Sequence, residues 1–151
     1  MGFWHNVLQS IMDGDTSETA PPHVRALAFD RSIALKKWED AAVWVRWQAE
    51  PQFSNGSGSL FGGYICAVAD AVADFAMMTS HPDDQVHATT DLRIAFFRPV
   101  LPGAIDVVGR VITRNRYSAY VEVEFRDGDG KLCAKASLVE AIIKFQAGKR
   151  S

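Results

Sequence analysis

The stretch GSLFGGYICAVADAVADFAMM, residues 58–78, decides the fold of this chain. Its small apolar residues predict a helix from about Phe61 to Ser80 that other elements must cover on nearly every side. Asp70 and Asp74 lie inside this helix, and the stretch contains no Lys or Arg that could pair with them. Because carboxylates are rarely buried without a partner, we expect at least one of these aspartates to serve chemistry.

The segments on both sides of this helix have the composition of strands, with many β-branched and aromatic residues. The DGDG sequence at 127–130 is a strong hairpin signal, and the segment after it is long enough to suggest a β-bulge. Two strands before the helix and about four after it favour an α+β fold, with a curved antiparallel sheet wrapped around the helix. The predicted strands are residues 26–35, 41–50, 86–99, 104–114, 117–126 and 131–145.

Length and composition exclude several classes of protein. The chain has 151 residues, of which 48% are hydrophobic and 23% charged, which predicts a single packed domain. We assign residues 1–25 to an N-terminal helical appendage and linker, and residues 26–151 to the main domain. The net charge of −2 gives no footprint for nucleic acid. No apolar run approaches the roughly 20 residues of a membrane span, and no signal peptide is evident.

The two cysteines, Cys66 and Cys133, are far apart in the sequence and have no metal-ligand spacing. We expect both to be buried free thiols, which places the protein in a reducing cytoplasm. The four histidines form no HxxxH or HExxH pattern. The sequence therefore predicts no metal site and no cofactor.

Asp70 and Asp74 share one face of the predicted helix. Both could simply point to solvent at its edge, which we favour for Asp74, whereas the small apolar neighbours of Asp70 suit a base or nucleophile. Gly62 and Gly63 open the helix, where unpaired N–H groups could hold an oxyanion, although the pair could also serve only a tight turn. Gly62 and Asp70 are about 12 Å apart along the helix axis, so one small reacting group cannot readily contact both in a single subunit. A common site would therefore require a symmetric dimer.

Three stretches carry a resemblance to a known family: SNGSGSLFGGYICAVADAVADFA, TTDLRIAFFRP and VITRNRYSAYVEVEFRDGDGKLCAKA. In this order they resemble the hotdog-fold acyl-CoA thioesterases of the phenylacetate-pathway type, within the 4-hydroxybenzoyl-CoA thioesterase superfamily. The resemblance covers roughly residues 40–145. It implies an antiparallel sheet of five to six strands around one long central helix, an acyl-CoA substrate, and a homodimer or homotetramer.

The resemblance also implies roles for individual residues. Asp70 would be the general base that activates water, or the nucleophile that attacks the thioester carbonyl. The N–H of Gly62 would hold the oxyanion, and Asn55 would orient water or substrate from across a subunit interface. Thr89 would help to position the water. Arg116 would lie near the CoA phosphates.

Phe61 departs from the family pattern, which usually has a histidine immediately before the Gly-Gly pair. A phenylalanine cannot donate a hydrogen bond or titrate, so it would instead form an aromatic wall of the acyl pocket. The leading function that the resemblance implies is hydrolysis of a medium-chain, long-chain or aromatic acyl-CoA to the free acid and CoA. The alternative is a non-catalytic acyl or CoA-binding hotdog protein. A dehydratase ranks third, because it needs a His–carboxylate pair and His81 and His87 both follow the helix.

Overall fold

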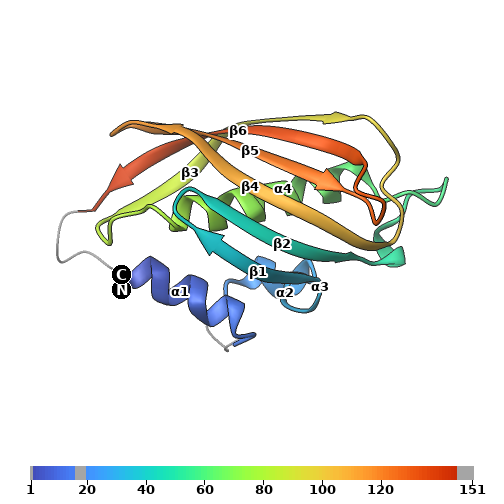
Figure 1. The fold of residues 1–151 in the computed structure, drawn as a ribbon, viewed down its shortest axis with the longest axis horizontal. Helices are drawn as coiled ribbons and strands as arrows, with labels where there is room; N and C mark the ends of the chain where they lie inside the picture. Colours follow the sequence, from blue (N-terminus) through green and yellow to red (C-terminus); the bar gives the residue numbers. More distant parts are fainter. Residues whose placement is uncertain (1, 16–19, 146–151) are drawn as a thin grey trace.

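The computed structural model describes residues 2–15 and 20–145. Within these residues, six strands form one antiparallel sheet in the order β1-β2-β4-β5-β6-β3, and this sheet covers the long helix α4 (Figure 1). The arrangement confirms the expected α+β hotdog fold. The strands are β1 (Ile33–Glu39), β2 (Ala42–Ala49), β3 (Gln85–Phe96), β4 (Gly103–Arg114), β5 (Ser118–Arg126) and β6 (Leu132–Lys144).

Helix α4 (Gly62–Met78) forms the centre of the hydrophobic core and lies within two residues of the predicted helix at each end. Val68 and Val72 are completely buried against the sheet. Close packing depends on Gly109 in β4, where a Cβ atom would lie only 2.9 Å from the Val72 side chain and 3.1 Å from its carbonyl oxygen. The small residues of α4 and this glycine together let the helix approach the sheet.

The N-terminal part, over residues 2–15 and 20–32, contains three helices: α1 (Phe3–Met12), α2 (Pro22–Ala26) and α3 (Phe29–Ser32). Helix α1 confirms that the N-terminal segment contains a helix, and its Leu8 is completely buried. The prediction of a strand over residues 26–32 is wrong. Pro22 opens a helix there, and the left-handed backbone of Ala28, with φ of 60°, breaks the extended chain. Strand β1 begins only at Ile33 and continues to Glu39, four residues beyond the predicted end of the strand at residue 35.

Strands β6 and β3 each contain a β-bulge, and the one in β3 shapes the site. In β6, Phe125 pairs with Ala134 and Arg126 pairs with Leu132, so that Cys133 is the extra residue and the predicted bulge of the last strand is confirmed. In β3, Thr89 pairs with Glu140 and Asp91 pairs with Val139, which leaves Thr90 as an extra residue. Because the Thr90 bulge shifts the alternation of β3 by one, Thr89 faces α4 on the same side as the apolar residue Leu92.

Cys133 is buried as expected, whereas Cys66 is only half-buried, and both are free thiols. Part of the predicted linker, residues 16–19, lies outside the described residues, as do residues 146–151. The division of the chain after residue 25 therefore stays a prediction. Among the described residues, no helix combines the length and apolar character needed to cross a membrane.

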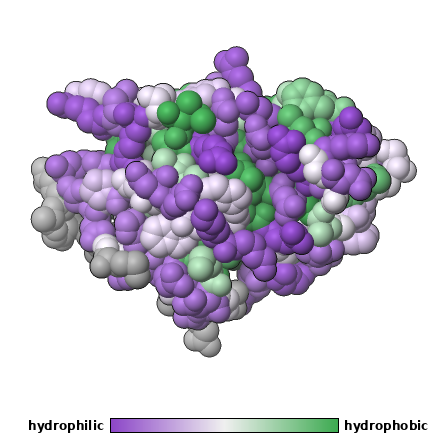
Figure 2. Space-filling model, viewed as in Figure 1, coloured by the Kyte–Doolittle hydropathy of each residue, from purple (hydrophilic) through white to green (hydrophobic). Residues whose placement is uncertain are grey.

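Figure 2 shows that one face of the molecule is mainly hydrophilic, with hydrophobic side chains confined to smaller areas. Strand β3 is at one edge of the sheet, because it stands last in the order of the described strands and pairs there with β6. Most residues of β3 from Ala88 onward are exposed in the single chain. Long exposed edge strands are usually protected by pairing with another chain or by a covering element.

Candidate active site

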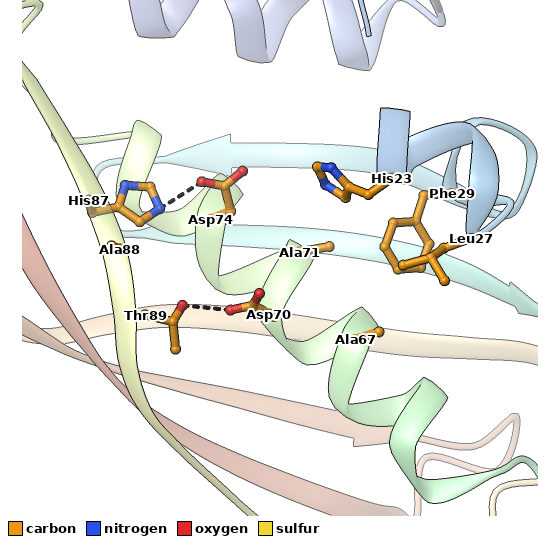
Figure 3. Close-up of a pocket in the computed structure, with 10 residues that line it drawn as sticks. All are labelled: His23, Leu27, Phe29, Ala67, Asp70, Ala71, Asp74, His87, Ala88 and Thr89. Atoms are coloured by element: carbon orange, nitrogen blue, oxygen red, sulfur yellow. Dashed lines mark hydrogen bonds and ion pairs between the residues drawn. The ribbon is translucent and has the colours of Figure 1, made fainter. Parts of the chain in front are cut away.

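A cavity of about 280 Å³ lies between α4, the first half of β3 and the N-terminal helices α2 and α3. Asp70 and Asp74 reach it from α4, and His87 and Thr89 reach it from β3 (Figure 3). The opposite side is formed by His23, together with apolar side chains of the N-terminal segment. The cavity therefore brings two of the four predicted catalytic residues, Asp70 and Thr89, to one place.

Asp70 and Thr89 are joined by a short hydrogen bond in which Thr89 Oγ1 donates to Asp70 Oδ1 at 2.6 Å (Figure 3). Asp70 is exposed in the single chain and has water-accessible space in front of it, as a base that activates water requires. Thr89 Oγ1 also lies 3.0 Å from both carboxyl oxygens of Glu140 in β6. Glu140 is only 1% exposed, and burial raises the pKa of its carboxyl group above the ordinary value.

A second series of hydrogen-bonded side chains begins at Asp74, four residues after Asp70 in α4. His87 Nε2 lies 2.6 Å from Asp74 Oδ1, His87 Nδ1 lies 2.6 Å from His81 Nε2, and His81 Nδ1 lies 3.2 Å from the guanidinium of Arg114. Because arginine can only donate, His81 Nδ1 must accept, so His81 donates to His87 and His87 donates to Asp74. Burial, reinforced by the positive charge that His87 can carry and by that of Arg114, lowers the pKa of His81 to about 4.

These hydrogen bonds bear on two expectations from the sequence. The Asp74 side chain is 43% exposed, as expected, but it also accepts a hydrogen bond from His87, whose side chain is only 9% exposed. The argument that ranked a dehydratase low is also incomplete, since His87 follows the helix in sequence but is paired with a helix carboxylate in space. Arg114 belongs to the same network, where it forms hydrogen bonds with His81, Gln85 and Ser80.

The remaining predicted catalytic residues lie around the other end of α4. Gly62 is the first residue of the helix, so the helix itself leaves its N–H without a partner. It lines a second cavity of about 380 Å³ with Phe96 and Arg98. Asn55 lies in the preceding exposed loop, where its Oδ1 accepts hydrogen bonds from the backbone N–H and the hydroxyl of Ser57. The two cavities have no lining residue in common.

Phe61 and Arg116 are both at the surface of the single chain. Phe61 is 60% exposed, and its ring lies over Gly63, where an added Cβ would be 2.7 Å from the ring edge. Arg116 lies in the turn between β4 and β5 with its guanidinium 4.5 Å from the centre of the Tyr117 ring. Neither side chain lines the cavity that contains Asp70. A single chain therefore does not bring all the predicted site residues together.

Sequence reasoning missed Glu140, although the sequence carries a signal for it. In β6 the inward positions are Ala134, Ala136, Leu138 and Glu140, so that a carboxylate occupies a place where the alternation demands an apolar residue. A charged residue in the apolar phase of a strand is a candidate for a buried polar network. The pairing of His87 with Asp74 had no such signal, because it depends on the Thr90 bulge.

Known proteins share this fold and parts of this sequence. A phenylacetic acid degradation-related protein from Ralstonia eutropha JMP134, provisionally described as a thioesterase, superposes with a TM-score of 0.75 at 22% identity, over 89% of this chain and 98% of its own. A thioesterase from Haemophilus influenzae superposes with a TM-score of 0.77 at 17% identity, over 99% of this chain and 96% of its own. At these identities the similarity establishes the fold alone.

Similarity in sequence identifies the family. A protein of Saccharolobus solfataricus that is provisionally named an esterase is 35% identical over 85 residues, which cover 56% of this chain and 60% of the relative's length. Residues 57–134, just over half of the chain, match the thioesterase superfamily. This region contains α4, Asp70 and Thr89, and extends to the bulge in β6. The chain belongs to the thioesterase superfamily.

Proposed function

We propose that the protein is an acyl-CoA thioesterase that hydrolyses a medium-chain, long-chain or aromatic acyl-CoA to the free acid and CoA. The observation that carries this proposal is the exposed Asp70 carboxylate, held by a 2.6 Å hydrogen bond from Thr89 at a cavity of the central helix. Membership of the thioesterase superfamily supports thioester hydrolysis as the reaction class.

In the proposed reaction, Asp70 removes a proton from a water molecule, and the hydroxide oxygen attacks the carbonyl carbon of the thioester. The carbonyl oxygen becomes an oxyanion, which the N–H of Gly62 stabilises at the positive end of the helix. The tetrahedral intermediate then collapses with cleavage of the C–S bond. The CoA sulfur receives the proton that Asp70 had taken, so that one water is consumed and the carboxyl group returns to its starting state.

This reaction needs two subunits. Gly62 and Asp70 are separated by about 12 Å along α4, and they line different cavities of one chain. The exposed edge strand β3 offers a surface through which two copies could pair their sheets. We propose a homodimer, or a homotetramer built from it, in which Asn55 and Gly62 of one subunit complete the site around Asp70 of the other. Two equivalent sites follow from the symmetry.

The substrate contacts are assigned from the chemistry of the side chains. Phe61 would cover the acyl chain with its exposed ring, which favours a bulky or aromatic acyl group. Arg116 would contact the CoA phosphates, and Arg98 is a second basic residue beside Gly62. Two free cysteines suit a cytoplasmic enzyme. No metal or other cofactor has a role in the proposed reaction.

The second candidate is a non-catalytic acyl or CoA-binding protein, which is favoured by Phe61 at a position expected to hold a histidine. One experiment distinguishes the two candidate functions. Purified protein is mixed with short-chain, long-chain and aromatic acyl-CoAs, and released thiol is measured with a colorimetric reagent. We expect turnover of at least one acyl-CoA, whereas binding of CoA without release of thiol from any of them would favour the binding protein.

A further inference from the structure

The hydroxyl of Thr89 is surrounded by more acceptors than one hydroxyl can serve. It lies 2.6 Å from Asp70 Oδ1 and 3.0 Å from each carboxyl oxygen of Glu140. A threonine hydroxyl carries one proton and can accept through its oxygen, whereas an ionised carboxylate can only accept. If both acids were ionised, the one that did not receive the Thr89 proton would face the hydroxyl oxygen with no hydrogen between them.

The distances indicate which acid receives the proton of Thr89. The 2.6 Å separation from Asp70 is the length expected for a hydroxyl that donates to a charged carboxylate, and the two 3.0 Å separations from Glu140 are longer. Asp70 is exposed and can be solvated as an anion, whereas Glu140 is 1% exposed. No Lys or Arg among the described residues forms an ion pair with Glu140. The buried acid is therefore the one for which a charge costs most.

From this geometry we infer that Glu140 is a protonated positioning residue: its carboxylic acid donates to Thr89 Oγ1 and thereby directs the Thr89 proton onto Asp70. The inference rests on the proposed function, because it assigns the support of the proposed base. A fixed Thr89 proton occupies Asp70 Oδ1 and leaves Asp70 Oδ2 to receive the water that is to be deprotonated.

The surroundings of Glu140 favour its neutral form. The titratable groups that face it are Asp70 and Asp74 from α4 and His87 from β3. Burial is the largest influence and raises the pKa of Glu140. A Thr89 hydroxyl that donated to Glu140 instead of to Asp70 would lower this pKa, and His87 lowers it as well, whereas the two aspartates raise it. When Glu140 loses its proton at high pH, it becomes an acceptor and competes with Asp70 for the proton of Thr89. We therefore expect a decline of kcat on the alkaline side that belongs to Glu140.

Two substitutions separate this role from a merely structural one. Glu140→Gln keeps the shape and a donor toward Thr89 but cannot ionise, so kcat should stay within about threefold of wild type and the alkaline decline should disappear. Glu140→Ala removes the donor, so kcat should fall by at least about tenfold with little change in KM. Glu124→Gln, at the surface of β5, is the matched control and should retain the wild-type pH profile.

A spectroscopic measurement tests the proton on Glu140 without any need for turnover. At pH 8 the infrared difference spectrum between wild type and Glu140→Gln should contain the carbonyl band of a protonated carboxylic acid. Absence of that band, or a Glu140→Gln enzyme as impaired as Glu140→Ala, would overturn the inference, as would an alkaline decline that persists in Glu140→Gln. A wild-type protein that hydrolyses no thioester yet has the infrared band would count against the proposed function alone.

Discussion

His81 is a buried imidazole whose protonation should set the acid stability of the fold. It is 6% exposed, and burial holds its pKa at about 4, well below the ordinary histidine value of 6.5. Between pH 6.5 and 4 the unfolded chain binds a proton at this residue that the folded chain does not bind, so the free energy of unfolding must fall as the pH falls. At about 1.4 kcal/mol per unit, the full loss amounts to about 3 kcal/mol.

The measurement is urea denaturation of wild type and His81→Gln at pH 7.5 and at pH 4.5, at one protein concentration. At pH 7.5 His81 is neutral, so any difference between the proteins there reflects lost packing and hydrogen bonds. The further loss on moving to pH 4.5 should be smaller in His81→Gln by about 2–3 kcal/mol. Ser80→Ala, which changes the same loop but keeps the imidazole, is the matched control. Equal losses in wild type and His81→Gln would show that the network does not hold His81 neutral.

Three further predictions concern the proposed active site. Asp70→Asn should keep the fold and the oligomer but lower kcat by at least about 10², the scale of lost acid–base catalysis, and near-normal turnover in a folded variant would remove Asp70 from the mechanism. Mixing Asp70→Asn subunits with Asn55→Ala subunits should restore part of the activity, because one of the two sites in each hybrid dimer then keeps both residues; stable but inactive hybrids would contradict a shared site. Phe61→Ala should weaken binding of the preferred acyl-CoA by about 1–3 kcal/mol and shift the acyl preference, as measured by KM and kcat across a chain-length series. If the wild type is inert and Phe61→His gains turnover, the binding-protein function is the correct one.

Most of the fold could be predicted because local patterns and tertiary packing agree. The small apolar run of α4 needs cover on nearly all sides, and the alternating strands after it supply that cover. The largest error, a strand over residues 26–32, arose because apolar composition outweighed the helix-starting signal of Pro22. The buried Phe29 in that segment is apolar because α3 packs into the core, and periodicity over so short a segment cannot separate a helix from a strand.

The candidate site was less accessible to sequence reasoning. Asp70 could be singled out because a carboxylate inside an apolar helix conflicts with its surroundings. Glu140 carried a similar conflict, because it occupies an inward position of β6 where the alternation places apolar residues. The pairing of His87 with Asp74 depends on register between elements, which is fixed by tertiary contacts rather than by local propensity. Site residues that a second subunit would contribute are harder still to predict, because local sequence patterns do not show how two copies pack together.

The extra residue at Thr90 divides β3 into two segments, and the positions that face the helix change from odd to even residue numbers between them. The segment after it follows the frame of the hydrophobic core through Leu92, and the segment before it follows a frame that presents Thr89 and His87 to the helix. With unbroken alternation from Leu92, the residues presented would be Thr90 and Ala88 instead, and the His87–Asp74 and Thr89–Asp70 contacts would be lost. The chemistry of this cavity therefore depends on how many residues the strand contains at one point as much as on which residues they are.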